Sequence, residues 1–536
     1  MSLAIMSPPE TGRAAAPLAQ MFAPTLASDE ERLLDARVTL LLQRFLGSER
    51  VTSDVPFEAL GDLLPGAGAP AAPALPGDYV ARVIEPIVEH SINTASPRFI
   101  GHMTTALPYF VRPLSRLIAG LNQNPVKVET AKSVTPLERE ALATLHRLVY
   151  DRADGFYREH AQARERTLGI LTGGGTAANI TALWIARNAA LGPRGELGGV
   201  EREGLAAALA DRGHRRAVIL GSALMHYSME KAADVLGLGI SGLDRVEVDR
   251  RGRVRVERLR RALEEHRARG DLVLAVVGVA GATDTGSIDP LDELAALAGE
   301  AGVHFHVDAA WGGPLLFSRR HRGKLAGIER ADTVTIDGHK QLYLPMGIGA
   351  VVMRAPDAAR AIEKQAPYII RRGSPDLGRR SLEGSRPAMA LLLHAGLHLI
   401  GGDAYEALID AGVARAGALA AAIRRRPAFE LLCEPDANIV NYRYLPPALR
   451  GARARWSPAD MEAVDAANLR LQEAQSRAGR SFVSRTTLAH TGRGGGAPVV
   501  SLRAVLANPL TTEAQLEEVL DEQEALARAL EGGGGP

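Results

Sequence analysis

The chain has 536 residues, more than a single domain usually contains, and 46% of them are hydrophobic, so two or three domains with sizeable cores are expected. The 63 basic residues nearly balance the 62 acidic ones, which gives no electrostatic reason to expect binding to nucleic acid or to an anionic membrane. Cys433 is the only cysteine, which excludes a disulfide within the chain and a multi-cysteine metal site, and fits a reducing cytoplasm.

The N-terminal part of the sequence predicts flexible chain followed by helices. Residues 1–30 are rich in Ala, Pro and Ser and are expected to be flexible. They lack the pattern of a secretory signal, and the sequence contains no stretch of about 18 apolar residues, so we expect no membrane span. Helical patterns follow at residues 31–46 and 78–90, separated by a linker rich in Pro, Gly and Ala at 64–77.

From about residue 168, short apolar runs alternate with amphipathic helices, which predicts a mostly parallel sheet covered by helices on both faces. The runs are 168–172, 217–221, 245–248, 272–280, 304–309, 333–336 and 348–353, and the helices between them include 177–191, 257–269 and 291–301. After about residue 401 the sequence is typical of a smaller α+β domain, with helices at 405–425 and 458–478. Residues 532–536 are expected to be flexible.

Polar residues that follow the apolar runs are candidate site residues, because ligands of open α/β sheets bind at the carboxyl ends of the strands. Residues 172–179 read TGGGTAAN and lead from an apolar run into a helix. The glycines allow the backbone to approach an anion, the helix N-terminus supplies free N–H groups, and Thr176 adds a hydroxyl. The segment predicts a phosphate site, with a tight strand-to-helix turn as the alternative.

Three further predicted strands end at or shortly before a residue that could take part in cofactor binding or catalysis. Asp308 lies at the end of an apolar run and could keep a pyridine nitrogen protonated or could cap a helix, while the small Ala310 leaves room for a flat ring. Lys340 follows the run at 333–336 and could form a Schiff base or reach the surface as an ordinary lysine. His226 could stack on a bound ring or be a structural histidine.

The order of these motifs (GGGTAAN, HYSMEKA, ATDTGSID, HVDAAWGG, DGHK) resembles the group II pyridoxal 5′-phosphate (PLP)-dependent decarboxylases of fold type I, which include glutamate, aromatic amino acid and cysteine-sulfinate decarboxylases. The resemblance runs from about residue 97 to residue 508. The stretches PRFIGHMTTALPYF and LNQNPVKVETAKSVTPLERE are most similar to the bacterial branch of pyridoxal-dependent aspartate 1-decarboxylases.

The resemblance implies an α/β architecture of the PLP-dependent transferase fold type I, with a mostly parallel seven-stranded sheet in the large domain. Residues 31–96 would form an N-terminal helical dimerisation segment, 97–400 the PLP-binding large domain and 401–531 a small α+β domain. The protein would be a cytoplasmic homodimer with active sites at the subunit interface, and residues 382–386 would reach the neighbouring subunit's cofactor.

The resemblance also implies roles for individual residues. Lys340 would hold PLP as a Schiff base and Asp308 would pair with its pyridinium nitrogen, while His226 and Ala310 would lie against opposite faces of the ring. The other implied residues are Gly174, Gly175, Thr176 and His339 at the phosphate, Thr283 near the cofactor, Tyr368 as the proton donor, and Arg503 and Thr104 at the substrate. No metal ligand is implied.

The function that this resemblance implies is PLP-dependent α-decarboxylation by a carboxy-lyase, with L-aspartate, giving β-alanine and carbon dioxide, as the first expected substrate. Glutamate, giving GABA, and cysteine sulfinate or an aromatic amino acid are the alternatives. A different fold type I lyase or aminotransferase is a further alternative, although His226 and the dipeptide His339-Lys340 favour the decarboxylase group. A non-catalytic PLP-binding protein is disfavoured because Lys340, Asp308 and His226 are all present.

Overall fold

The structure, a computed structural model, describes residues 29–64, 66–71, 74–366, 373–451, 456–491 and 497–533. The chain divides into two compact units, residues 1–49 with 53–93, and residues 50–52 with 94–536. The expected flexible N-terminus at 1–30 lies almost wholly outside the described residues, as do residues 534–536 of the expected flexible tail. The proposed boundary between a large and a small domain near residue 400 falls within the second unit and stays a prediction.

The described part of the first unit is helical and contains α2 (Asp29–Leu46), α3 (Phe57–Leu60), α4 (Pro76–Tyr79) and α5 (Glu85–Glu89). The single helix expected at 78–90 is interrupted by a π-helical turn over Val80–Ile84, in which the N–H of Glu85 bonds to the carbonyl of Val80. Pro86 explains the interruption, because it has no N–H to continue the α-helical ladder. Within this unit Arg37 of α2 donates to the Glu85 carboxylate at 2.8 Å.

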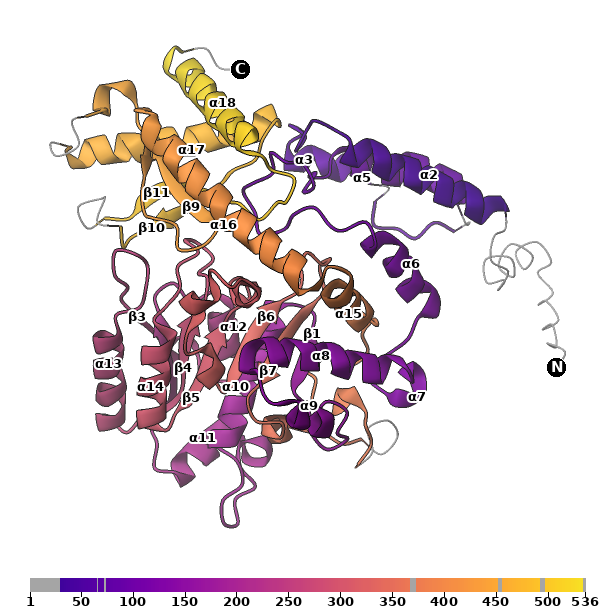
Figure 1. Cartoon of the computed structure of the whole chain (residues 1–536), viewed down its shortest axis with the longest axis vertical. Coiled ribbons are helices and arrows are strands. Elements are labelled where there is room, and N and C mark those ends of the chain that lie inside the picture. The colour runs from indigo at the N-terminus through magenta and orange to yellow at the C-terminus, as the bar shows by residue number, and fades with distance from the viewer. Residues whose placement is uncertain are drawn as a thin grey trace. The chain divides into compact units, whose positions relative to one another are not determined.

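The second unit contains the seven-stranded, mostly parallel sheet that the sequence predicts. Its strand order is β1-β7-β6-β5-β4-β2-β3, and β7 runs antiparallel to both of its neighbours while the other pairs are parallel (Figure 1). The strands are β1 (Gly169–Thr172), β2 (Ala217–Ser222), β3 (Leu243–Val246), β4 (Leu272–Val279), β5 (His304–Asp308), β6 (Thr333–Asp337) and β7 (Gly349–Met353).

One predicted strand was wrong in its position. The run at 245–248 was expected to form a strand, but β3 begins two residues earlier, where Leu243 pairs with Ile219 of β2. Val248 instead forms an isolated antiparallel bridge with Val254. The chain therefore leaves the sheet after Val246, and Val248, although apolar, is not part of the sheet.

Helices cover both faces of this sheet, and each face has its own core. One face packs against α8, α13, α14 and α15, and the other against α10, α11 and α12 (Figure 1). Alternation along the strands separates the two cores, since Leu171 and Val352 face the first and Ile170 and Val351 the second. The helices of this part are α6 (Val111–Leu121), α7 (Val128–Ala131), α8 (Val134–Tyr150), α9 (Asp154–His160), α10 (Gly175–Ala190), α11 (Val200–Asp211), α12 (Ser228–Val235), α13 (Val256–Ala268), α14 (Leu291–Ala301) and α15 (Ala390–Leu399).

The rest of the chain forms a four-stranded antiparallel sheet in the order β10-β11-β9-β8. Helices α16, α17 and α18 pack on one face of it (Figure 1). Both α17 and α18 begin with a capping box. The elements are β8 (Phe429–Leu431), β9 (Ile439–Tyr444), β10 (Ser484–Leu488), β11 (Val499–Val505), α16 (Gly401–Arg425), α17 (Pro458–Ala478) and α18 (Glu513–Glu531).

The other face of the small sheet packs against the large one. Ile439 and Val505 of the small sheet form a buried cluster with Trp311, which follows β5, and with Met103 and Ala507. Arg503 lies on the same face, because side chains two residues apart on a strand point to the same side. The small sheet thus brings Arg503 to the carboxyl edge of the large sheet.

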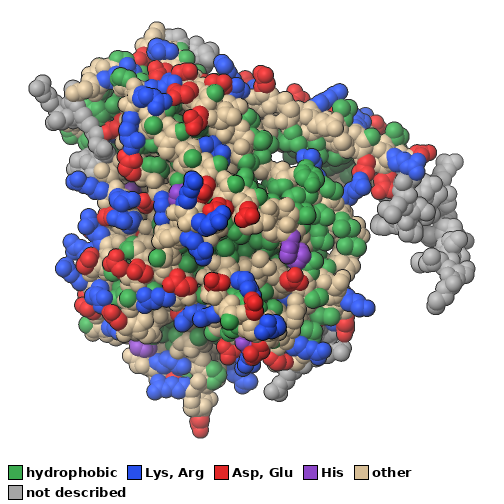
Figure 2. Space-filling view, viewed as in Figure 1, with side chains coloured by type: hydrophobic (Ala, Val, Ile, Leu, Met, Phe, Trp, Pro, Cys, Tyr) green, Lys and Arg blue, Asp and Glu red, His purple; other side chains and the backbone are tan. Residues whose placement is uncertain are grey.

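The surface carries charges of both signs. On the face shown in Figure 2, basic and acidic side chains are interspersed, in keeping with the net charge of +1. Among the residues that the structure describes, no helix is both long enough and apolar enough to cross a membrane.

The buried ion pair between Glu138 of α8 and Arg386 is expected to be important for stability. The side chains are 2% and 10% exposed, and Arg386 donates to both carboxylate oxygens. Glu138→Ala would leave a buried guanidinium without its carboxylate, so we expect the free energy of unfolding to fall by about 3–5 kcal/mol. Urea denaturation measures this loss. Arg260→Ala, which removes a surface pair with Glu300, is the control and should change the urea midpoint little; equal midpoints for both variants would contradict the prediction.

Candidate active site

A cavity of about 660 Å³ lies at the carboxyl ends of the large-sheet strands. The structure brings most of the predicted site residues together around it. Those that line it are Thr104, Gly174, Gly175, Thr176, His226, Thr283, Asp308, Ala310, His339 and Lys340. Arg503 lies next to this group without lining the cavity, and Tyr368 lies outside the described residues.

The glycine segment 173–175 connects β1 to α10 in a conformation that few other residues could adopt. Gly174 has a φ of +152°, which only glycine adopts readily. A Cβ on Gly175 would lie 2.9 Å from Oδ2 of Asp337, closer than real contacts allow, and the N–H of Gly175 donates to that same oxygen at 3.1 Å. The turn therefore places the amino end of α10 and the half-buried Thr176 beside the end of β6.

Glu383 contacts this turn from the segment that precedes α15. Its Oε1 accepts a hydrogen bond of 2.8 Å from the N–H of Gly173 in the same chain. The sequence did not predict this contact, because Glu383 and Gly173 are 210 positions apart. The expected role of residues 382–386 at a neighbouring subunit stays a prediction.

Lys340 lies three residues beyond the last residue of β6. Its Nζ is 3.8 Å from Oδ2 of Asp337, and the lysine side chain is only 15% exposed. Nδ1 of His339 lies 2.9 Å from the other oxygen of Asp337, although the two groups lack the alignment of a hydrogen bond. Asp337 thus contacts the glycine turn, the histidine and the lysine, a position that sequence reasoning missed although the residue directly follows the predicted apolar run at 333–336.

The loop after Lys340 is held in a strained conformation. Tyr343 is fully buried with a φ of +59°, which is rare for an aromatic residue, and its hydroxyl donates to the carbonyl of Ala507 at 3.0 Å. Gln341 donates to the carbonyl of Trp311 and accepts from Asn438 of the segment entering β9, both at 2.7 Å. Contacts with the small sheet therefore fix the course of the loop that carries Lys340.

Asp308 ends β5 as a buried carboxylate whose oxygens both accept hydrogen bonds. Oδ2 accepts from the side-chain amide of Asn179 at 2.9 Å, and Oδ1 accepts from the N–H of Ala310 at 3.2 Å. Asn179 lies one turn into α10 and gives its second amide hydrogen to Ser228 at 3.0 Å. These bonds offset the cost of burying the charge.

His306 completes this network beneath Asp308. Because both amide hydrogens of Asn179 are used, its Oδ1 faces Nε2 of His306 at 3.0 Å, so this nitrogen carries the proton. Nδ1 then accepts from the hydroxyl of Thr333 at 3.0 Å. Burial lowers the pKa of His306 to about 4, so the ring is neutral near pH 7. His306 could have been found from the sequence, since it shares a strand face with Asp308.

His226 is joined to the same network through Ser228. Its Nδ1 lies 2.9 Å from the Ser228 hydroxyl and also accepts from the N–H of Ser228 at 3.3 Å. The neutral ring therefore carries its proton on Nε2. Burial is the main cause that lowers the pKa of His226, and Lys340 lowers it further, while Asp308 acts in the opposite direction.

Arg503 of β11 lies beneath the segment that holds His102 and Thr104. Its Nε donates to the carbonyl of Thr283 at 2.7 Å and Nη1 to Ser484 at 3.2 Å, while Nη2 is buried without a partner among the described residues. Burial lowers the pKa of Arg503 to about 10. His102, which also lines the cavity, lies 3.0 Å from the Thr104 hydroxyl, and its pKa is lowered by burial and then by Arg503.

Comparisons with known proteins find a family model and a curated relative that match most of the chain. The conserved domain of pyridoxal-dependent decarboxylases matches residues 69–445. The chain is 42% identical over 506 residues to an aspartate 1-decarboxylase of Aliivibrio fischeri, a match that covers 93% of this chain and 92% of that protein. It is 31% identical over 475 residues to an L-2,4-diaminobutyrate decarboxylase of Rhizobium meliloti, covering 88% and 85%.

Solved structures show the same fold. The crystal structure of mouse CSAD matches with a TM-score of 0.79 at 27% identity, covering 92% of this chain and 99% of that one. A structure of Oryza sativa TDC with PLP and tryptamine matches with a TM-score of 0.81 at 20% identity, covering 95% and 99%. The expected fold type I architecture and the expected cofactor, PLP, are confirmed, and the chain belongs to the pyridoxal-dependent decarboxylases.

Proposed function

We propose that this enzyme removes the α-carboxylate of L-aspartate and releases β-alanine and carbon dioxide. The observation that carries the proposal is the 42% identity to an aspartate 1-decarboxylase, which extends over 93% of the chain. Relatives named for other substrates are less similar, including the L-2,4-diaminobutyrate decarboxylase at 31% and a mouse cysteine sulfinic acid decarboxylase at 29%. Glutamate, cysteine sulfinate and aromatic amino acids are therefore the alternatives that the assay must include.

The residues around the cavity fit PLP, which supplies an electron sink when bound. Lys340 would hold the cofactor through Nζ, and the buried carboxylate of Asp308 would keep the ring nitrogen protonated. His226 and Ala310 would lie against the two faces of the ring, with Thr283 near the ring. The phosphate would bind at the amino end of α10, where Gly174, Gly175, Thr176 and His339 line the cavity.

Substrate binding is assigned to the side of the cavity lined by residues 102–104, with Arg503 of the small sheet next to it. Nη2 of Arg503 has no partner among the described residues, which makes this guanidinium the candidate to receive a substrate carboxylate. Thr104 lines the cavity beside it and would orient the substrate through its hydroxyl. Holding the carboxylate perpendicular to the cofactor ring would align the bond that must break.

The reaction breaks the bond between Cα and the carboxylate carbon, carbon dioxide leaves, and a proton must then reach Cα. We assign the delivery of this proton to Tyr368, which stays a prediction because the residue lies outside the described part of the chain. The cytoplasm as the site of action likewise stays a prediction.

The proposal includes a homodimer that uses residues 31–96. What supports it is the apolar surface of α2, on which Leu33 and Leu40 are 70% and 46% exposed. An amphipathic helix with such side chains in water gains free energy when a partner covers them. Light scattering coupled to size-exclusion chromatography is expected to give twice the mass of the chain, and a shift to monomer in Leu33→Glu/Leu40→Glu would support this assignment.

The substrate is tested by incubating the PLP-loaded enzyme separately with aspartate, glutamate, cysteine sulfinate, 2,4-diaminobutyrate, tyrosine and DOPA. We expect the highest kcat/KM for aspartate, with β-alanine and carbon dioxide released in equal amounts. A higher kcat/KM for another amino acid would retain decarboxylation and replace the substrate. Amine exchange with a keto acid, without carbon dioxide, would overturn the proposed reaction.

Lys340→Ala is expected to abolish turnover, because the variant lacks the amine that holds the cofactor. Borohydride treatment of the wild type should fix the cofactor on the peptide that contains Lys340, which mass spectrometry detects. Lys364→Ala is the matched control, since Lys364 pairs with Glu201 at the surface. Labelling of a different lysine in the wild type would remove Lys340 from this role.

Asp308→Asn keeps the size of the side chain and removes its charge. Because a neutral amide cannot hold the ring nitrogen protonated, we expect kcat to fall by at least about 100-fold. PLP titration followed by absorbance should show in parallel whether cofactor affinity falls. A kcat equal to that of the wild type in the fully loaded variant would show that Asp308 does not have this function.

A further inference from the structure

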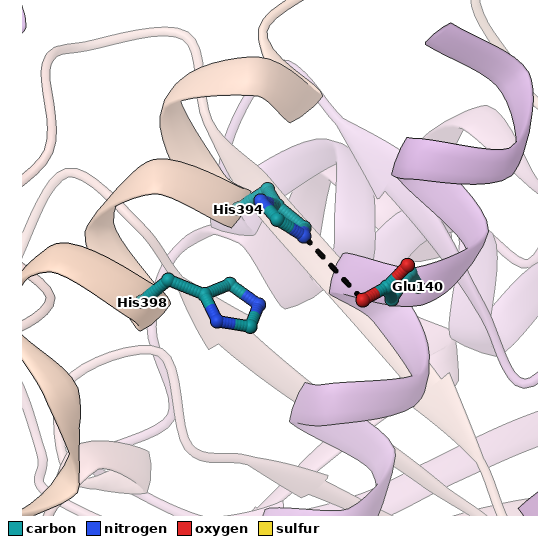
Figure 3. A group of neighbouring side chains, drawn as sticks. All are labelled: Glu140, His394 and His398. Atoms are coloured by element: carbon teal, nitrogen blue, oxygen red, sulfur yellow. Dashed lines mark ion pairs between the residues drawn. The ribbon is translucent and has the colours of Figure 1, made fainter. Parts of the chain in front are cut away.

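A cluster of possible metal ligands lies outside the cavity, between α8 and α15. His394 and His398 are four residues apart on α15 and so lie on one face of the helix, and Glu140 of α8 points toward them (Figure 3). One ligand atom from each residue lies within 4.8 Å of the other two, and Nε2 of His394 is 3.6 Å from Oε1 of Glu140. Nothing in the proposed decarboxylation uses this cluster.

We propose that Glu140, His394 and His398 bind one divalent transition-metal ion, with Zn²⁺ as the reference ion. Two histidines one helical turn apart chelate such an ion from a single face, and a carboxylate from a facing element adds a third ligand. Imidazole nitrogen selects Zn²⁺, Ni²⁺ or Cu²⁺ rather than Ca²⁺ or Mg²⁺, which prefer oxygen ligands.

The geometry needs only a small adjustment to hold the ion. With bonds of 2.0–2.1 Å, the ligand atoms of a tetrahedral Zn²⁺ site lie roughly 3.3 Å apart, so the cluster would close by about 1.5 Å at most. The Glu140 side chain is 60% exposed, so there is space around it for this adjustment, while the His394 side chain is 26% exposed. The two imidazole rings already lie with their centroids 4.1 Å apart. Solvent exposure leaves a fourth position open to water.

Because of where the site lies, a bound ion would link two helices. It would join α15 to α8, and the buried pair of Arg386 and Glu138 already connects α8 to the segment just before α15. That segment also contains Glu383, whose carboxylate accepts a hydrogen bond from Gly173 of the glycine turn. Binding the ion would therefore stabilise the same part of the fold that borders the proposed phosphate site, without contact with the substrate.

Isothermal titration of the chelator-treated, PLP-loaded enzyme with ZnCl₂ tests the inference. We expect one Zn²⁺ per chain, and binding at least about tenfold weaker in His398→Ala and in Glu140→Gln. Both residues are exposed, so the substitutions should not disturb folding. His214→Ala removes a histidine from a distant turn and should bind Zn²⁺ as the wild type does.

Thermal unfolding provides the second readout, because an ion that binds only the folded state raises the midpoint. The midpoint should rise with Zn²⁺ in the wild type and in His214→Ala, and not in His398→Ala or Glu140→Gln. Zn²⁺ affinity equal in all variants, or no stoichiometric binding to the wild type, would overturn the proposal. The decarboxylation assay is separate, so failure of the proposed substrate would leave this result unaffected.

Discussion

The buried carboxylate of Asp308 is the constraint on which the rest of the site depends. An ion at this depth costs several kcal/mol unless hydrogen bonds surround it, and the required donors come from elements far apart in the sequence. Asn179 of α10 donates to Asp308 and also binds Ser228 and His306. The amide that satisfies the acid therefore also fixes the position of α10 against α12 and β5. The hydrogen bonds that stabilise the buried charge thus also hold together residues at the base of the cavity.

The antiparallel strand β7 helps to fix the position of Lys340. In a parallel arrangement, the chain would have left the carboxyl edge of β6 through a long crossover. Because β7 returns beside β6 in the opposite direction, residues 338–348 form a short connection that stays at the edge where the cavity lies. Tyr343 and Gln341 anchor this connection to the small sheet, and the unusual φ of Tyr343 shows that the anchoring outweighs local backbone preference.

The sequence predicted the elements whose signals are local. The apolar runs gave the strands of the large sheet to within about two residues, because buried parallel strands are almost continuously apolar. The π-helical turn before Pro86 and the shift of β3 were not predicted, since both depend on backbone bonds that the pattern of apolar residues does not record.

Within the site, motif residues such as Lys340 and Asp308 were found because Asp308 ends a strand and Lys340 lies shortly after one. Their supporting residues were harder to find. Asn179, Asp337 and His306 stood in the motifs, but their functions arise from contacts across 127 to 162 positions of sequence. The cluster of Glu140, His394 and His398 was missed for the same reason, since a spacing of four between histidines is common on helices and Glu140 is distant in the chain.

The residues assigned to the cofactor and those assigned to the substrate come from different segments of the chain, which has a consequence for how the substrate could change. The groups assigned to the cofactor lie at strand ends and turns of the large sheet. Arg503 and Thr104, assigned to the substrate, come from β11 and from the segment just before α6. If these assignments hold, substitutions in the two segments would change which amino acid is accepted, while the residues assigned to the cofactor would stay the same.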